Sequence, residues 1–292
     1  MIWQDYKKLY ANGLKQYSPK FKKELQNQVN TYCRTLDYNA ISDKAIKKTI
    51  QKLHLAMGVK MAQISSKVVK RSVKGHYEAL EVKSAETDLF AYTILQYLQT
   101  QGLDQLASDI TDTTKEQIRR YLIQSAEQNL TLPESIALLR NAGITDYRAE
   151  LIARTETGRA ANIGSMVGAT STGLVTIKEW IAAKDNRTRR IPRDQFDHLN
   201  MDGTKIPMDA TFKLQNKKGG FDLMLHPCDS SGSAGDVCNC RCTLGYEAQR
   251  DKNGKLLKLQ DNPPKGNVGM IWGILTNAVG MQIGNLIADL FE

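Results

Sequence analysis

The residues best suited to metal chemistry lie close together in the last third of this 292-residue chain. Four of its five cysteines fall between positions 228 and 242. Two of its four histidines, at 198 and 226, lie in the same third of the chain. Zinc takes thiolate and imidazole ligands in tetrahedral sets. The candidate zinc ligands are His198, His226, Cys228, Cys238, Cys240 and Cys242.

The spacing of these thiols argues against a simple zinc site. They follow the pattern C-x9-C-x-C-x-C and include no C-x2-C pair. Residues 238–246 are predicted to form a short strand, in which alternate residues share a face at steps of about 6.6 Å. Three thiols in that register do not surround one ion without a bend. Three interpretations stay open: a zinc site, a disulfide, or buried reduced cysteines packed as small apolar residues. We expect the last of these, and hence no cofactor.

Charged residues form a second group of candidates. Arg154-Thr155-Glu156 lies on a predicted helix; Arg159 is close to one turn after Thr155 and Glu156, and Asn162 follows one turn later, so these groups share a face. Further arginines and carboxylates lie in the loop after residue 184 and around the cysteines. Bidentate arginine–carboxylate pairs would lock a loop-rich region that has little regular structure. We therefore expect a network of ion pairs here.

A catalytic interpretation uses some of the same side chains. Glu156, Asp185, His198 and Asp229 have the groups needed to hold a divalent ion or to act as acid and base. The sequence has no H-E-x-x-H or G-x-S-x-G pattern to support this. We expect that the protein is not an enzyme, with a metal-dependent hydrolase as the alternative.

The elements that must position these residues are mostly helical. Apolar residues recur every three or four positions from Phe21 to Leu36, just after Pro19, and again from Ile46 to Val68, where Asp43 is the expected N-cap. Alternating β-branched residues predict a strand at 175–181, followed by a long loop region. Further helices are predicted at 84–101, 113–128, 133–143 and 145–168.

All of the excess positive charge lies in the first third of the chain. Residues 1–100 hold 17 Lys and Arg against 8 Asp and Glu, whereas the rest is balanced. This asymmetry favours either an acidic partner, such as nucleic acid or an acidic protein surface, or simply solvated helix faces. His54 lies on the predicted lysine-rich helix at 46–68, and we expect it at the surface or at the edge of the apolar stripe of that helix. The candidate contact residues are Lys44, Lys47, Lys48, Lys52, Lys60, Lys67 and Lys70.

The order of the motifs resembles the phage head morphogenesis family, the Mu F-like minor head proteins. A helix with Arg154-Thr155-Glu156 and a later asparagine is followed by Lys178-x-Trp180, Asp185-x-Arg-Thr-Arg189, a histidine and Asn239-Cys-Arg-Cys242. The resemblance spans about residues 113–246, and Pro227-Cys-Asp229 stands where the family often has Pro-Gly-Asp. The residues assigned to this structural motif are Arg154, Glu156, Arg159, Asn162, Asp185, Arg187, Arg189, Asp229, Asn239, Cys240, Arg241 and Cys242.

The resemblance implies a minor capsid protein of a tailed bacteriophage, present in several copies in the virion. It would contact the portal and other capsid or scaffold proteins, with DNA as a further candidate partner, at the portal vertex or inside the head. Assembly would take place in the host bacterial cytoplasm. A start without a signal-peptide pattern and an odd cysteine count favour a reducing compartment. The alternatives are a phage-borne toxin and a zinc-stabilised nucleic-acid-binding module.

The last segment has a composition of its own. Residues 266–288 carry no charge and contain two G-x-x-x-G pairs, at 269/273 and 280/284. A packed or oligomer-contacting helix, a membrane-active segment and disorder stay open here, and any membrane contact is expected only through 266–292. We predict an α+β fold in three parts: a basic helical arm at 1–110, a loop-rich α+β domain at 111–250, and a polar linker with an apolar helix at 251–292.

Overall fold

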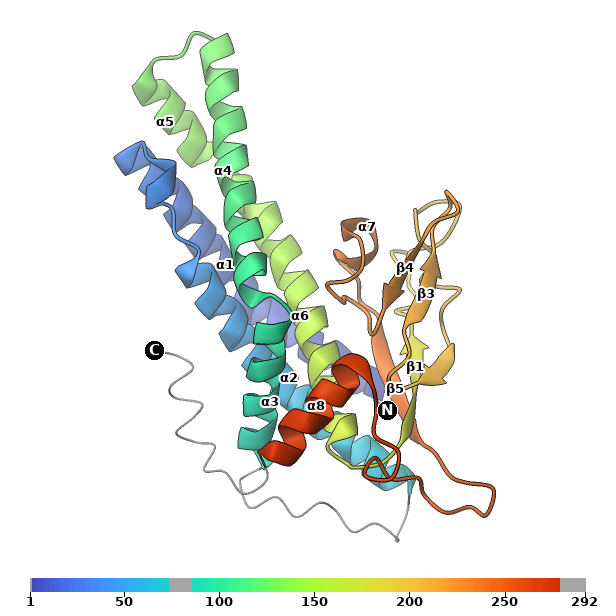
Figure 1. Cartoon of the computed structure of the whole chain (residues 1–292). Coiled ribbons are helices and arrows are strands. Elements are labelled where there is room, and N and C mark those ends of the chain that lie inside the picture. The colour runs from blue at the N-terminus through green and yellow to red at the C-terminus, as the bar shows by residue number, and fades with distance from the viewer. Residues whose placement is uncertain (1, 74–85, 279–292) are drawn as a thin grey trace.

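The computed structural model of the protein describes residues 2–73 and 86–278. It is an α+β structure in which long helices form a bundle and small antiparallel sheets lie at one side of it (Figure 1). The helices are α1 (Ile2–Thr35), α2 (Lys44–Ser72), α3 (Glu86–Thr100), α4 (Leu103–Glu127), α5 (Leu132–Asn141), α6 (Ile144–Thr170), α7 (Ala234–Val237) and α8 (Gly266–Asn277), with a short 3-10 turn, η1, at Tyr38–Ala40. The strands are β1 (Thr176–Ile181), β2 (Lys205–Pro207), β3 (Phe212–Gln215), β4 (Phe221–Met224) and β5 (Thr243–Ala248).

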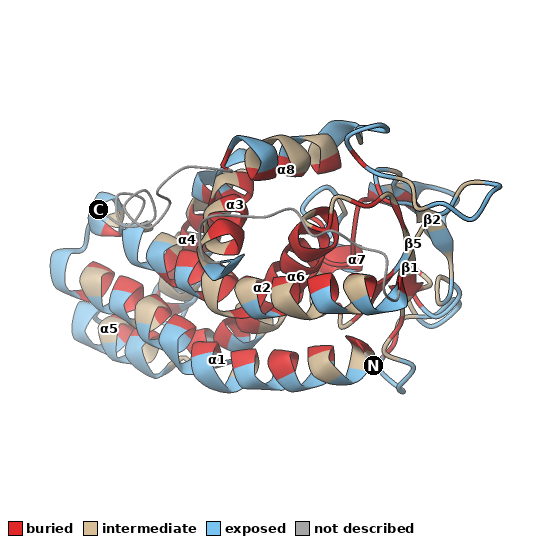
Figure 2. Ribbon diagram, turned by 90° about the horizontal axis from the view of Figure 1, so that it is seen from below, coloured by how far each residue is buried: buried red, intermediate tan, exposed pale blue. Residues whose placement is uncertain are grey.

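Helix α6 is the centre of the bundle. Every residue from 155 to 170 is buried, and the helix packs most extensively on α2 and α1 (Figure 2). Small residues make this packing possible. A Cβ atom at Gly164 would overlap the backbone of Gly58, and one at Gly168 would overlap the backbone of Ala62. The backbones of α2 and α6 are therefore in direct contact at two successive turns.

Helix α1 is longer than predicted. It begins at Ile2 and runs through Pro19, which was predicted to precede it. Its buried face starts well before the proline, with Tyr6 and Tyr17 almost completely covered by the bundle. Tertiary burial of this face stabilises the extra turns despite the hydrogen bond that proline cannot donate.

Helices α4 and α5 form the far end of the bundle. α4 begins at Leu103, ten residues before the start predicted at Thr113. The hydroxyls of Thr113 and Thr114 bond to backbone carbonyls one turn earlier, so these residues continue the helix and do not begin it. α5 begins with a capping box in which Glu134 accepts hydrogen bonds from the backbone and hydroxyl of Thr131, at 2.7 and 2.6 Å. A second, small core joins α1, α4 and α5 there.

The sheets are small and antiparallel. β1 lies between β2 and β5, and β3 pairs with β4 as a separate two-stranded ribbon. The predicted strand at 175–181 is confirmed by β1, whereas the predicted strand at 238–246 is wrong in its first half. Asn239 has a φ of +59°, which bends the chain, so that β5 begins only at Thr243. Trp180 of β1 is fully buried and meets the ring of Phe212 edge-on at 5.2 Å.

Helix α8 covers one end of the bundle. Val268, Ile271 and Leu275 are buried, and the helix contacts α3 and α6 (Figure 1). The second predicted G-x-x-x-G pair, at 280/284, lies outside the described residues. Within residues 2–73 and 86–278, no helix combines the length and apolar character needed to cross a bilayer.

The predicted boundary at residue 110 falls inside α4. One hydrophobic core extends from α1 and α2 through α6 to β5 and α8. The basic first third is therefore not a separate arm in this structure, because its two long helices bury their apolar faces against α6, which belongs to the second predicted part.

The α2–α6 contact can be tested with Gly168→Ala. The added methyl group would overlap the Ala62 backbone, so we expect the free energy of unfolding to fall by about 1–3 kcal/mol. Gly273→Ala in α8 is the matched control, because no other atom lies within 4 Å of its added methyl group. It should be neutral or stabilising by about 0.5–1 kcal/mol. Urea denaturation measures both, and equal midpoints for the two variants would contradict the close approach.

Candidate functional site

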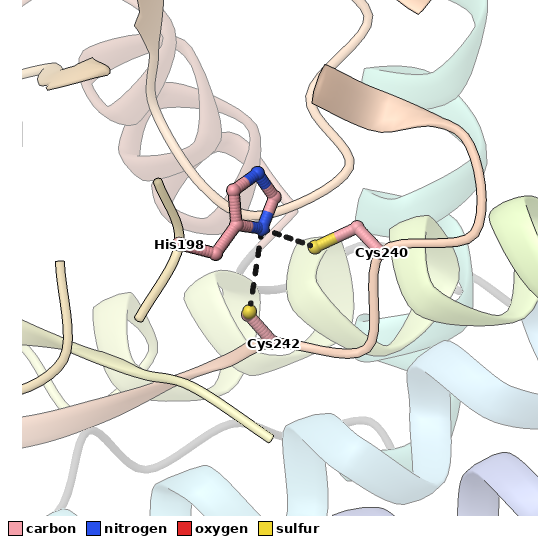
Figure 3. Close-up of side chains that lie close together, drawn as sticks. All are labelled: His198, Cys240 and Cys242. Carbon is pink, nitrogen blue, oxygen red and sulfur yellow. Dashed lines mark hydrogen bonds between the residues drawn. The ribbon is translucent and has the colours of Figure 1, made fainter. Parts of the chain in front are cut away.

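Three of the six candidate zinc ligands meet in the interior. His198 comes from the loop after β1, and Cys240 and Cys242 come from the segment that leads into β5 (Figure 3). The Nδ1 atom of His198 lies 3.5 Å from Sγ of Cys240 and 3.6 Å from Sγ of Cys242. The three ligand atoms lie within 4.8 Å of one another, and all three residues are buried. The bend at Asn239 removes the strand register that argued against such a grouping.

The other imidazole nitrogen of His198 is held by a carboxylate. Nε2 is hydrogen-bonded to Oδ1 of Asp236, a residue that is fully buried on α7. The indole of Trp180 meets the imidazole edge-on, with ring centroids 5.6 Å apart. Burial lowers the pKa of His198, but Cys240 and Asp236 outweigh it and raise the pKa to about 9. The ring is thus fixed in orientation, with Nδ1 directed at the thiols.

Cys228 borders this group from a third segment. Its thiol lies 3.5 Å from the carbonyl oxygen of Cys240. Hydrogen bonds with the Cys228 and Cys242 thiols hold the pKa of Cys240 well below its usual range. The same interactions, together with burial, raise the pKa of Cys228 and Cys242. Cys240 is therefore the thiol that loses its proton most readily.

The last two candidate ligands lie elsewhere. His226 is buried, and its Nδ1 is 2.8 Å from the carbonyl oxygen of Pro227. Burial lowers the pKa of His226, so the ring is neutral at pH 7. Cys238 is only half-buried, and its carbonyl accepts a hydrogen bond from Arg189. All cysteines of the described chain are free thiols, so the structure shows no disulfide among them.

Polar side chains of α6 hold the cysteine segments in place. The side-chain amide of Asn162 donates to the carbonyl of Pro227 at 3.1 Å and to that of Cys242 at 3.2 Å. Arg159 donates from Nε to the carbonyl of Cys228 at 2.9 Å. The hydroxyl of Thr155 accepts from the backbone N–H of Asn239 at 3.2 Å. Four points of the two cysteine segments are thereby fixed to one helix.

Glu156 is the centre of a buried charge network. Its carboxylate accepts a hydrogen bond from Arg159 at 2.6 Å and contacts Nε2 of His54 at 3.2 Å. Burial raises the pKa of Glu156, but Arg159 and His54 outweigh this and hold it below its ordinary value. The expectation that His54 lies at the surface is wrong, because α2 packs this face on α6 and burial lowers the pKa of the imidazole.

The remaining motif residues differ from the expected buried network. Asp185 pairs with Arg241 at 2.6 Å, but the Asp185 carboxylate is 41% exposed. Arg187 is exposed, and Arg154 pairs with Glu150 on the solvent side of α6. Asp229 caps its own loop by accepting the backbone N–H groups of residues 225 and 231 at 2.6 and 3.0 Å. Only the Glu156–Arg159 pair of the predicted network is buried.

Sequence reasoning missed the roles of two buried charged residues. Asp236 was only one of the carboxylates around the cysteines expected to pair with arginine, yet it binds His198 from 38 residues away. Lys178 is fully buried, donates to the carbonyl of Leu225 at 2.8 Å and lies 5.3 Å from the Phe212 ring centroid. Burial lowers the pKa of Lys178 to about 7, against the opposing effect of Asp229. The Lys-x-Trp pattern was the available signal for Lys178, because both residues point inward from β1.

A groove of about 720 Å³ runs beside this region, between the start of α4, α6 and α7. Arg148 lies in its wall, buried, and donates to the hydroxyl of Thr114 at 2.8 Å and to the carbonyl of Ile110 at 2.9 Å. Burial lowers the pKa of Arg148 to about 10. Glu156 and Arg159 also line the groove, but each is already bound to the other. The geometry therefore favours structural pairing over acid–base chemistry.

The fold and the site together define a structural class of protein: a helical bundle that fixes a loop-rich α+β unit through buried polar contacts. Residues 104–245 match the family model described as Phage Mu protein F like protein. The matched region is a little under half of the chain, and the match confirms the resemblance of the motifs to the phage head morphogenesis family. Searches of curated proteins and of solved structures gave no significant match.

The contrast between buried and exposed pairs gives a prediction about stability. Glu156→Gln keeps the shape of the side chain but leaves Arg159 buried without a counter-charge, so we expect a loss of about 3–5 kcal/mol in unfolding free energy. Asp185→Asn is the matched control, because the Asp185 side chain is 41% exposed, and should cost about 1 kcal/mol or less. Urea denaturation at pH 7 compares them. Similar losses for both variants would refute the ranking.

Proposed function

We propose that the protein is a minor capsid component of a tailed phage, which joins the assembling head and acts in genome packaging or delivery. The family match over residues 104–245 carries this proposal. The portal protein, with other capsid or scaffold proteins, is the proposed partner, and several copies are incorporated into each particle. The protein is assembled in the host cytoplasm and resides in the head interior or at the portal vertex.

The lysine-rich faces of α1 and α2 support contact with an acidic partner. A hollow of about 310 Å³ lies between the two helices, and Lys8, Lys60 and Lys67 line it together with Asp5. Of the candidate contact residues, Lys44, Lys48, Lys52, Lys60 and Lys67 are exposed. Lys47 and Lys70 are partly used in pairs with Asp104 and Glu86. We assign the hollow and its rim to the phosphates of the packaged DNA, with an acidic protein surface as the competing partner.

The C-terminal segment is the proposed route to any membrane contact. α8 buries its apolar face on α3 and α6, so exposure of that face requires α8 to leave the bundle. We propose that residues 266–292 stay docked on protein in the assembled particle and meet a membrane only after release. Leaving the bundle would expose the apolar surface of three side chains at roughly 25 cal/mol per Å², which opposes undocking in solution.

The proposed function predicts that the chain is found in purified virions. Mass spectrometry of virions should detect it at a fixed ratio to the portal protein. Particles from a phage that lacks it should contain less DNA or deliver it less efficiently, and supplying the wild-type chain in trans should restore both. Supplying Gly273→Ala, which leaves the fold intact, should restore them equally well. A chain absent from virions, with normal particles formed without it, would contradict the proposal.

The charge of the α1–α2 hollow predicts salt-dependent binding. Replacing Lys8, Lys60 and Lys67 by alanine should weaken DNA binding by the full chain and reduce the slope of log affinity against log salt by about 2–3. The control removes the same charge from the sheet side, through alanine at Lys213, Lys217 and Lys218, which are all exposed.

Fluorescence anisotropy at several salt concentrations measures the DNA effect, and a pull-down with purified portal measures the protein effect. A triple variant that loses portal binding but keeps the salt slope for DNA would assign the hollow to an acidic protein surface instead.

A further inference from the structure

We propose that the chain holds a structural zinc ion between His198, Cys240 and Cys242, with Cys228 as the fourth ligand. Such a site would tie together three loop segments that no sheet connects directly. It is independent of the proposed role in the phage head, because it concerns only how this chain is held together.

The distances within the cluster fit a tetrahedral ion. Zinc lies about 2.3 Å from a thiolate sulfur and about 2.0–2.1 Å from an imidazole nitrogen, so a tetrahedral arrangement separates the two ligand atoms by roughly 3.5 Å. The Nδ1 atom of His198 lies 3.5 and 3.6 Å from the two sulfur atoms. The spacing of these three buried ligand atoms is therefore the spacing that a tetrahedral zinc ion requires.

Asp236 supplies an independent observation. A histidine that ligates a metal through one nitrogen nearly always donates the N–H of its other nitrogen to a carboxylate, carbonyl or water, which fixes the tautomer. Nε2 of His198 is bonded to the buried Asp236 carboxylate, so Nδ1 is the nitrogen left to coordinate an ion beside the two cysteines. The cluster thus has both the ligands and the outer partner of a metal site.

Cys228 is the proposed fourth ligand: its thiol borders the group of three at the Cys240 carbonyl and would have to turn towards the ion to join it. Its backbone has a φ of +64°, a left-handed conformation that residues other than glycine adopt rarely. Arg159 fixes its carbonyl, and Gly158 leaves room for its sulfur, which would lie 2.8 Å from a Cβ atom at position 158. A cysteine at such a backbone position is explained if its thiol is needed beside Cys240. Four buried protein ligands would leave no open position on the ion, which is the pattern of structural and not catalytic zinc sites.

Metal binding changes the protonation of the cluster. Each coordinating thiol must lose its proton, so zinc uptake releases protons and weakens as the pH falls. The ion would stabilise all three thiolates in the buried space. A disulfide between two of these thiols is the competing arrangement, which loses two hydrogen atoms to an oxidant and excludes the metal.

The test uses the full chain, produced in the presence of zinc and purified without chelator. Elemental analysis should find one zinc per chain, and native mass spectrometry should show the same adduct. Cys240→Ser and Cys242→Ser should lose the metal. Cys33→Ser and Cys238→Ser are the matched controls and should keep it, because neither thiol belongs to the cluster. A chelator added to the wild-type chain should lower its melting temperature, which keeps the test decisive if the ligand variants fail to fold.

Cobalt substitution tests the fourth ligand. Cobalt-loaded wild type should show thiolate charge-transfer absorption of a tetrahedral site, and Cys228→Ser should lower its intensity by about one third as one of three thiolates is lost. An unchanged spectrum in that variant would assign the fourth position to another group and overturn the ligand set. Two results would overturn the site itself. One is a wild-type chain without zinc whose four cysteines in this segment all react as free thiols after denaturation. The other is a mass two hydrogens lower than that of the reduced chain, which indicates a disulfide.

Discussion

The direct backbone contact between α2 and α6 is the constraint on which the rest of the structure depends. Gly164 and Gly168 of α6 lie so close to the backbones of Gly58 and Ala62 of α2 that no side chain fits at either α6 position. One consequence is that α6 is buried on all sides from residue 155 to 170. Any polar group on this stretch must find its partner inside the protein, because an unsatisfied buried charge or amide is costly. Thr155, Arg159 and Asn162 of this stretch find their partners in the cysteine segments and anchor them.

Those anchors explain how a region with little sheet keeps a defined shape. β1, β2 and β5 supply one small sheet, and the cysteine segments run outside it. Asn162 and Arg159 bind three carbonyl groups of these segments, at residues 227, 228 and 242. Backbone carbonyls that would pair along a ladder in a larger sheet are here satisfied by side chains of a helix. The conformations with positive φ at Cys228 and Asn239 persist because the surrounding contacts fix them.

The sequence predicted features that depend on the local spacing of residues along a helix. It did not predict features that depend on contacts between distant segments. The apolar stripe from Ile46 to Val68 predicted α2, and the shared face of Glu156, Arg159 and Asn162 was correctly placed on one helix. The early start of α1 was missed because proline was treated as a boundary, although burial of the tyrosine face overrides it. His198 is separated in sequence from Asp236 and Cys242 by 38 and 44 residues. No local spacing reveals that these side chains meet.

The same geometry sets limits on how the basic first third can act. Its apolar faces are buried on α6, so it cannot swing away as an independent arm without exposing the main core. A partner that binds the lysines on the outer surface of α1 and α2 would meet one body that includes the loop-rich unit, because β5 packs directly on α2 and α6. A long-range electrostatic attraction can orient such a body before close contact forms. Rigid attachment then transmits that orientation to the loop-rich unit, so a contact made by α1 and α2 also fixes which surface of the family domain faces its neighbour.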